Sequence, residues 1–319
     1  MRVLITGMNG FAGSHLADYL LTLPDTELYG GVFGNCDNIA HLAGRATILE
    51  GNLTDPRAAH ELLTRAQPDR IFHLAGQAFA PASYQDPWAT LEINIRAQIN
   101  ILHAVAQSQR APRILVIGSI DEFGRVAPEQ MPLTEESPLR PDSPYAVSKI
   151  AQDYLGLQYF LSHHLPIVRV RPTNHIGPRQ NEQFVTANFA KQIADIEAGA
   201  RAPALIVGNL GAQRDFVDVR DMARAYALAL ERGEPGAAYN IGSGGVHSIQ
   251  EIVDALVQLS ARHIQVRQDP ARLRPSDTPI IYSDPKKFRA QTGWTPQIPL
   301  AQSLRDILDY WRAKIQKGS

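Results

Sequence analysis

The stretch from Val3 to Gly13 constrains the fold of this chain more than any other. Three short apolar residues, Val3 to Ile5, predict a buried strand, and a helix is predicted from Ser14 to Leu23. Between them lie the evenly spaced glycines Gly7, Gly10 and Gly13. Glycine has no Cβ, so backbone N–H groups can approach a bulky anion, and the helix N-terminus adds unpaired donors with partial positive charge. The stretch predicts a pyrophosphate site, with a tight turn that binds nothing as the alternative.

The glycine spacing is Gly-x-x-Gly-x-x-Gly rather than the Gly-x-Gly-x-x-Gly of ordinary dinucleotide sites. We assign the neighbouring residues Asn9, Phe11 and Ala12 to the same cofactor site. The next predicted strand, about Glu27 to Phe33, ends without the carboxylate that grips the ribose 2′-OH in NAD-specific sites, and Asp37 comes too late. The sequence therefore favours NADP(H), with NAD(H) as the alternative.

Composition excludes several classes of protein. The chain has 319 residues, enough for one large domain or for one plus a smaller domain, and its net charge of −1 gives no case for nucleic-acid or bulk membrane binding. No apolar run approaches the roughly 20 residues of a membrane span. Cys36 is the single cysteine, which fits a reducing cytoplasm. Met1 and Arg2 lead straight into a strand, so we expect no signal peptide. The histidines lack metal-ligand spacing, so we expect no metal.

Predicted strands and helices alternate along the first half of the chain. Strands at 46–51, 70–74, 113–117 and 169–172 alternate with helices at 55–66, 88–107 and 144–164. This rhythm predicts an α/β fold with a Rossmann-type, doubly wound parallel sheet, whose strands all end at one ligand-binding edge. Small residues at this edge let a cofactor lie against the backbone. The alternative is that they are small because a helix packs closely there. The cofactor candidates at strand ends are Asn52, Leu53, Leu74, Ala75 and Gly76.

Two segments at this edge carry groups suited to proton transfer. Tyr145 and Lys149 lie four residues apart near the start of a helix and share one face, and Ser119 follows the fifth strand. Lowering the pKa of a tyrosine from about 10 to about 7 needs roughly 4 kcal/mol. We expect the Lys149 ammonium, a nicotinamide charge and a dry pocket to supply it together. Tyr145 would then donate a proton to a substrate oxygen held by Ser119. The alternative is an exposed helix pair without function.

These residues together resemble the extended short-chain dehydrogenase/reductases that act on nucleotide sugars. The resemblance rests on Gly7, Gly10, Gly13, Ser119, Tyr145 and Lys149 and covers nearly the whole chain. It implies NAD(P) at the glycine turn, catalytic Ser119, Tyr145 and Lys149, and Pro172 facing the nicotinamide. It also implies a nucleotide-binding domain of 1–171 plus roughly 214–243, and a smaller α/β substrate-binding domain of 172–213 and 244–319. A homodimer through helices 88–107 and 144–160 follows as well, with burial inside one chain as the alternative.

Further motifs resemble the GDP-mannose 4,6-dehydratase branch of that family. They are Asn174-His175 with Phe184-Val185-Thr186, Gly208-Asn209-Leu210 leading to Arg214, and Arg274-Pro275-Ser276-Asp277. Guanidinium forks match phosphate oxygens, and a carboxylate accepts hydrogen bonds from a ribose diol or a guanine edge. The alternatives are surface ion pairs for the arginines and a loop cap for the aspartate. The expected substrate-binding residues are Ser83, Asn174, Lys191, Arg214, Arg274 and Asp277.

The acid near Ser119 bears on the type of reaction. The resemblance places a glutamate two residues after the catalytic hydroxyl in dehydratases, but here that position is Asp121, one methylene shorter. Glu122 is one position out of register, although the loop could flex. We therefore expect a reductase of the 4-keto sugar that a dehydratase makes, with Asp121 orienting the sugar. The alternatives are the dehydratase itself, a nucleotide-sugar 4-epimerase and a catalytically silent NAD(P)-sensing protein.

Overall fold

A seven-stranded parallel sheet forms the centre of the computed structural model, which describes residues 1–272 and 278–318. The strand order is β11-β6-β5-β4-β1-β2-β3, and every neighbouring pair is parallel. This confirms the predicted doubly wound α/β fold. The strands are β1 (Arg2–Thr6), β2 (Glu27–Val32), β3 (Thr47–Glu50), β4 (Arg70–His73), β5 (Arg113–Ile117), β6 (Ile167–Pro172) and β11 (Ala238–Ile241).

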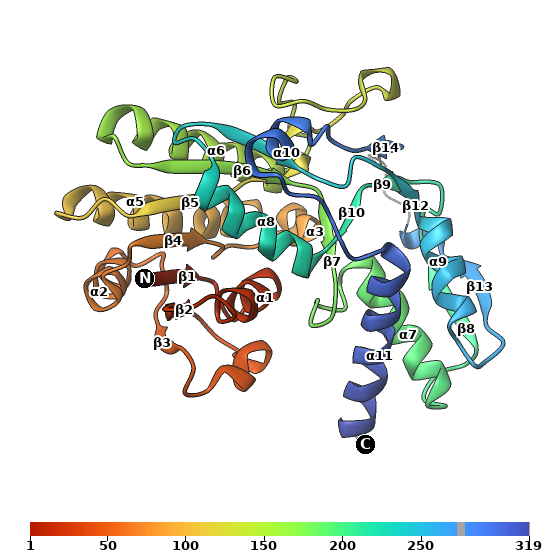
Figure 1. Ribbon diagram of the computed structural model, residues 1–319. Coiled ribbons are helices and arrows are strands. Elements are labelled where there is room, and N and C mark those ends of the chain that lie inside the picture. The colour runs from red at the N-terminus through yellow and green to blue at the C-terminus, as the bar shows by residue number, and fades with distance from the viewer. Residues whose placement is uncertain (273–277, 319) are drawn as a thin grey trace.

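Helices cover both faces of the sheet (Figure 1). One face carries α1 (Phe11–Leu20) and α8 (Val219–Arg232), and the other carries α2 (Pro56–Ala66), α5 (Ala97–Gln107) and α6 (Pro144–His163). Side chains of a strand alternate between its two faces, so Val3 and Ile5 pack into the core with α1 and α8, whereas Leu4 packs into the core with α2 and α5. The centre of β1, Val3 to Ile5, is continuously apolar because both of its faces are covered.

The helix predicted at 88–107 is interrupted. The chain forms α4 (Pro87–Leu91), a π-helical segment (Glu92–Arg96) and then α5. Asn94 in the π segment is fully buried, accepts from the backbone N–H of Gln77 at 2.7 Å and donates to Ser148 Oγ at 2.8 Å. The extra residue in this turn points Asn94 at the loop after β4, and such bulges often accompany functional sites. Helix α1 also begins at Phe11 rather than at the predicted Ser14.

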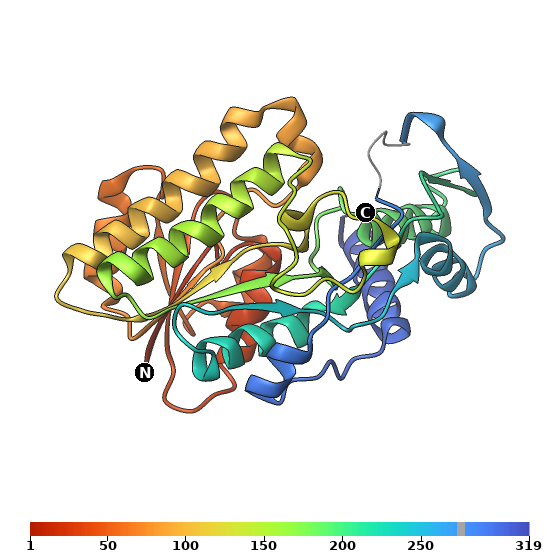
Figure 2. The ribbon, with the colours of Figure 1, turned by 90° about the horizontal axis from the view of Figure 1, so that it is seen from above.

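A second region lies beyond the carboxyl ends of the strands (Figure 2). Its own apolar core includes Phe189, Leu205, Ile252 and Ile307. Phe288 and Trp294, which we placed in the smaller domain, belong instead to the core around α1 and α8. The elements of this part and its connections are β7 (Asn174–Ile176), α7 (Val185–Glu197), β8 (Ala204–Val207), β9 (Gln213–Arg214), β10 (Phe216–Asp218), β12 (His247–Ser248), α9 (Ile249–Gln258), β13 (Gln265–Gln268), β14 (Ile280–Ile281), α10 (Lys286–Thr292) and α11 (Leu300–Gly318).

Short helical segments complete the described chain. They are α3 (Ala80–Gln85) and 3-10 turns at Asp37–Leu42, Ile120–Phe123, Pro128–Gln130 and Pro270–Arg272. Within residues 1–272 and 278–318, no helix combines the length and the apolar character that crossing a membrane requires.

Candidate active site

The glycine turn between β1 and α1 is shaped to admit an anion. Gly7 has a φ of +70°, and a Cβ there would lie 2.8 Å from the backbone nitrogen of Ala75. A Cβ on Gly13 would overlap the carbonyl oxygen of Gly7. Throughout the described ranges, no backbone acceptor is found for the N–H groups of Phe11, Ala12 and Gly13, the first turn of α1. Three donors at a positive helix end fit the pyrophosphate of a dinucleotide.

Two of the expected cofactor residues make local bonds instead. The Asn9 amide donates to the carbonyl oxygens of Phe33 and Asn35 at 2.9 and 2.8 Å, so it holds the loop that follows β2. Asn52 Oδ1 accepts from the backbone N–H of Thr54 at 3.1 Å. Both side chains therefore shape the loops that frame the strand ends. At the end of β4, the Ala75 N–H donates to Thr6 Oγ1 at 3.2 Å, and Pro172 ends β6 beside Ile241.

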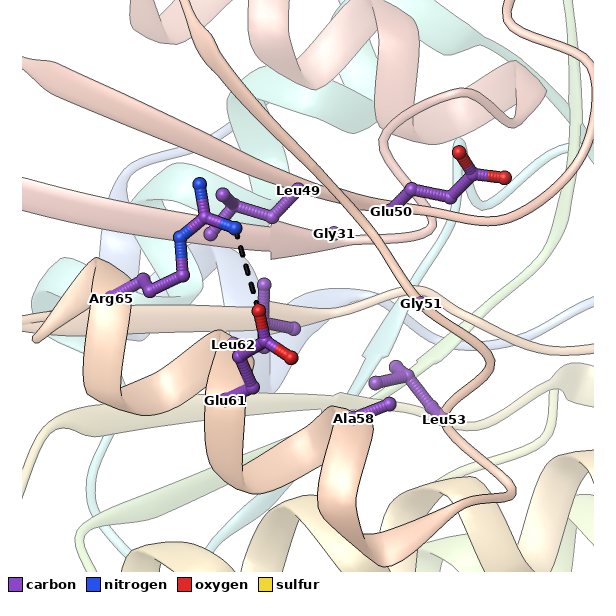
Figure 3. Close-up of a pocket in the computed structure, with 9 residues that line it drawn as sticks. All are labelled: Gly31, Leu49, Glu50, Gly51, Leu53, Ala58, Glu61, Leu62 and Arg65. Atoms are coloured by element: carbon purple, nitrogen blue, oxygen red, sulfur yellow. Dashed lines mark ion pairs between the residues drawn. The ribbon is translucent and has the colours of Figure 1, made fainter.

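A small cavity lies between the β2–β3 edge of the sheet and α2 (Figure 3). Its volume is about 20 Å³, and the Glu61–Arg65 ion pair at 3.5 Å lies at its wall. A single water molecule needs about 10–15 Å³ measured in this way. The cavity is therefore a packing gap beside Leu53 and is too small for a nucleotide. Its lining residues are Gly31, Leu49, Glu50, Gly51, Leu53, Ala58, Glu61, Leu62 and Arg65.

Tyr145, Lys149 and Ser119 come together at the ends of β5 and β6. Ser143 caps α6 by accepting from the Ala146 N–H at 3.1 Å, which places Tyr145 in the first turn with 7% of its surface exposed. Lys149 Nζ lies 5.9 Å from the centre of the Tyr145 ring. The side chain of Ser119 is hydrogen-bonded to that of Tyr145. The three residues predicted from spacing therefore form one buried cluster.

The pKa of Tyr145 departs from expectation. Burial raises its pKa above the usual range, the negative charge of Asp121 raises it further, and the hydrogen bond with Ser119 opposes them. The dry pocket that we expected to acidify the phenol has the opposite effect, because removing water disfavours the anion. The prediction of a lowered pKa is wrong for the protein without cofactor. Tyr145 keeps its proton at neutral pH, which is the state that a proton donor requires.

The ammonium of Lys149 is held by two acceptors. Nζ donates to the carbonyl oxygen of Ile117 at 2.9 Å and to Gln152 Oε1 at 2.8 Å. An ammonium has three donors, and acceptors in the described part of the chain occupy two of them, which leaves one for a ligand. Burial lowers the pKa of Lys149 to about 8, and the negative charge of Glu122 opposes that shift. Lys149 is thus charged at neutral pH and partly neutral in mildly alkaline solution.

The two acids that follow Ser119 point in different directions. Asp121 is half-buried, and its charge acts on Tyr145. Glu122 is fully buried, accepts from the Ser119 N–H at 2.8 Å and lies 3.1 Å from Arg171 Nε. The expectation that a flexing loop could present Glu122 to a substrate is not met in the structure, because its carboxyl group is bound inside the protein.

The expected substrate-binding residues have protein partners in the structure. Ser83 is fully buried and donates to the Ala80 carbonyl oxygen at 2.7 Å, and Asn174 Nδ2 donates to the Asp215 carbonyl oxygen at 3.4 Å. Lys191 pairs with Asp195 at 3.1 Å, and Arg214 Nη1 donates to the Thr278 carbonyl oxygen at 2.8 Å. A phosphate group would share or replace these partners. Arg274 and Asp277 lie outside the described residues.

The fold and the site define an NAD(P)-dependent oxidoreductase of nucleotide sugars, of the extended short-chain dehydrogenase/reductase type. The model of the GDP-mannose 4,6 dehydratase family matches residues 4–307, and this chain belongs to that family. The resemblance inferred from Asn174, His175 and their neighbours is thereby confirmed.

Individual relatives cover nearly the full length of the chain. The GDP-6-deoxy-D-mannose reductase of Pseudomonas aeruginosa is 35% identical over 99% of both chains. A GDP-mannose 4,6 dehydratase of Drosophila melanogaster is 26% identical, over 96% of this chain and 84% of its own. The solved structure of RMD from Pseudomonas aeruginosa, complexed with NADPH, superposes with a TM-score of 0.86 at 33% identity, covering 98% of this chain and 100% of the other.

Proposed function

We propose that this protein is a reductase of GDP-4-dehydro-6-deoxy-D-mannose that forms GDP-D-rhamnose. The observation that carries the proposal is the protonated, buried Tyr145 hydrogen-bonded to Ser119, with Glu122 bound inside the protein rather than available as a base. A ketone reductase needs a proton donor and an oxygen-binding hydroxyl, and a dehydratase needs a further carboxylate to remove a carbon-bound proton. The 35% identical relative named as a GDP-6-deoxy-D-mannose reductase supports the same assignment.

Each residue of the site has a separate role in the reduction. When bound, NADPH would supply the hydride for C4 of the sugar. Tyr145 donates its proton to the C4 oxygen, so the C=O bond becomes a CH–OH group, and Ser119 holds that oxygen by a hydrogen bond. Lys149 binds the nicotinamide ribose with its remaining N–H donor, and the first turn of α1 binds the pyrophosphate. Asp121 orients the sugar hydroxyls.

The preferred cofactor is NADP(H), with NAD(H) as the alternative. The strand end Val32-Phe33-Gly34-Asn35 carries no carboxylate to repel a 2′-phosphate. The similar Pseudomonas structure contains NADPH. We place further cofactor contacts at the strand ends, at Leu53, Leu74, Gly76 and Pro172.

The GDP moiety is placed in the region beyond the sheet. We propose that Lys191, Arg214 and Arg274 bind the diphosphate, that Asn174 and Ser83 bind near the sugar, and that Asp277 binds the nucleoside. The domain division at 171–172, with 214–243 returning to the first domain, is supported by β11, which pairs with β6 in the main sheet. It is also supported by the separate core of α7, α9 and α11.

The test is oxidation of NADPH by the purified protein with GDP-4-dehydro-6-deoxymannose freshly made by a dehydratase, followed by sugar analysis of the product. We expect substrate-dependent loss of NADPH absorbance and GDP-rhamnose as product. The second candidate, favoured by the name of the family model, is the dehydratase. Formation of a keto sugar from GDP-mannose and catalytic NADP⁺, without NADPH oxidation, would overturn the reductase in its favour.

We further propose a homodimer through α4, α5 and α6, in a reducing cytoplasm. Large apolar side chains are exposed along these helices, including Trp88 at 67%, Tyr154 at 53% and Leu161 at 62%. Exposed apolar patches of this kind mark protein interfaces. Light scattering of the wild type should give twice the chain mass, and Tyr154→Asp should shift the protein toward monomer; a wild-type monomer contradicts the proposal.

A further inference from the structure

A buried network of four ionisable residues lies directly behind Ser119. Arg171 Nε lies 3.1 Å from Glu122 Oε2 and donates to Asp153 Oδ2 at 2.7 Å, and Arg169 Nη1 donates to Asp153 Oδ1 at 2.5 Å. All four residues are less than 9% exposed. They come from three separate elements: Glu122 from the turn after β5, Asp153 from α6, and the two arginines from β6.

The sequence makes room for the Glu122 carboxyl group at this place. A Cβ on Gly118 would overlap Glu122 Oε1 and would lie 3.1 Å from the carbonyl oxygen of Val170. The position therefore needs glycine for close approach rather than for an unusual backbone angle. The carboxyl group can in this way reach the backbone of the next residue, Ser119.

Glu122 connects this network to the group that we assign to the C4 oxygen. Its Oε1 accepts from the Ser119 N–H at 2.8 Å, while Ser119 Oγ accepts from the Asp121 N–H at 3.1 Å. Ser119 is thus fixed on both its backbone and its side chain, and its hydroxyl is bonded to Tyr145. Moving the backbone at Ser119 would turn the hydroxyl away from the phenol, and a misplacement of about 1 Å can cost on the order of 100-fold in rate.

We propose that Glu122 is a positioning residue for reduction: held beside Arg171, which Asp153 fixes in turn, it sets the direction of the Ser119 hydroxyl. The inference rests on the proposed function and adds a residue that does not touch substrate. Burial and the Asp153 charge raise the pKa of Glu122 to about 8, so Glu122 is mostly protonated at neutral pH. A glutamine at this position would reproduce that uncharged state and keep an acceptor for the Ser119 N–H.

A double-mutant cycle separates positioning from general support of the fold. We expect Glu122→Ala to lower kcat at least tenfold with KM and the NADPH Kd within threefold, and Glu122→Gln to recover most of the loss. If Glu122 acts through Ser119, the double variant Ser119→Ala with Glu122→Ala should be no slower than Ser119→Ala alone. If the kcat losses of the two single variants multiply in the double variant, the proposal is overturned. The matched control is Glu136→Ala, an exposed glutamate, which should keep the wild-type kcat.

Hydrogen exchange of the Ser119 amide gives a readout that needs no turnover. We expect exchange at least tenfold faster in Glu122→Ala, near wild-type in Glu122→Gln and unchanged in Glu136→Ala. Unchanged exchange in Glu122→Ala would refute the positioning role even if the wild type failed to reduce the proposed substrate, which would contradict the proposed function alone. If Glu122→Ala does not fold, Arg171→Lys replaces it: loosening the contact with Glu122 should raise exchange and lower kcat together, and a change in neither refutes the role.

Discussion

The ammonium of Lys149 donates a hydrogen bond of 2.8 Å to Oε1 of Gln152, one turn further along α6. Gln152 is itself only 1% exposed, and its backbone carbonyl accepts from the Gln98 side chain at 2.6 Å. A flexible lysine loses rotamer entropy when it is held in one position. If a rigid neighbour already holds the lysine in the free protein, less entropy is lost when the cofactor binds. Gln152 therefore prepares Lys149 for the cofactor ribose.

Replacing Gln152 by Met keeps the volume and removes the acceptor. A hydrogen bond to a charged group contributes about 1.5–3 kcal/mol, so we expect NADPH affinity to fall roughly tenfold or more. Fluorescence titration with NADPH measures this. Gln158→Met, at an exposed position on the same helix, is the matched control and should bind NADPH as the wild type does. Equal affinity in both variants would show that Gln152 does not orient Lys149.

The buried lysine predicts a loss of activity in alkaline solution. Burial lowers the pKa of Lys149 from 10.5 to about 8, so its positive charge is complete below that pH and is lost as the pH rises through it. We expect kcat/KM to fall above about pH 8, measured from pH 6 to 10. Glu122 also has a pKa of about 8, and once ionised it raises the pKa of Lys149, so Glu122→Gln should move the decline to lower pH. If the decline vanishes in that variant, it belongs to Glu122 instead.

Removing the phenol should separate chemistry from binding. A general acid contributes about 10²–10⁴-fold, so Tyr145→Phe should lower kcat by that range while NADPH affinity stays within about twofold. Tyr226→Phe is the matched control, because that buried hydroxyl has no hydrogen-bond partner in the described part of the chain. We expect Tyr226→Phe to keep most of its turnover. Comparable turnover in Tyr145→Phe and the wild type would show that another group donates the proton.

Local patterns were enough to predict the sheet and the centre of the site. Gly7, Gly10 and Gly13 follow a strand directly, and Tyr145 and Lys149 share a helix face, so both signals depend on spacing of a few residues. The parallel sheet then brings the ends of different strands together without any knowledge of side-chain contacts. The residues predicted in this way are therefore those whose positions follow from short sequence spacing and from the ends of strands.

The residues behind the site escaped prediction because their partners are distant in sequence. Glu122 follows β5 and Arg171 lies in β6, with the whole of α6 between them in the sequence. A charged residue considered alone resembles a surface residue. A signal was present in Ile167-Val168-Arg169-Val170-Arg171-Pro172, where two arginines alternate inside an apolar strand. Buried guanidinium groups require buried acids. Asn94 was missed for another reason, since helical spacing does not reveal a π turn.

Neutralising Asp121 distinguishes the reductase from the dehydratase. In reduction Asp121 moves no proton, so Asp121→Asn should keep NADPH oxidation within about tenfold of the wild type, given that one sugar-orienting hydrogen bond contributes about 0.5–1.5 kcal/mol. Loss of its charge should also lower the pKa of Tyr145, which that charge raises. Product analysis with GDP-mannose is run in parallel. A wild type that makes keto sugar, together with an Asp121→Asn variant that makes none, would assign Asp121 as the base of a dehydratase.

Two glycines with similar positive φ angles test the anion site. Gly7 and Gly44 have φ angles of +70° and +76°, so an alanine at either position costs about 1–2 kcal/mol for the left-handed conformation. They differ in their surroundings, because a Cβ on Gly7 would meet the Ala75 backbone at 2.8 Å, whereas none of the described heavy atoms lies within 4 Å of a Cβ on Gly44. We expect both alanine variants to lower Tm, and Gly7→Ala alone to weaken NADPH binding more than tenfold by displacing the amides of α1. Calorimetric titration measures the affinity, and equal Kd values would place the pyrophosphate elsewhere.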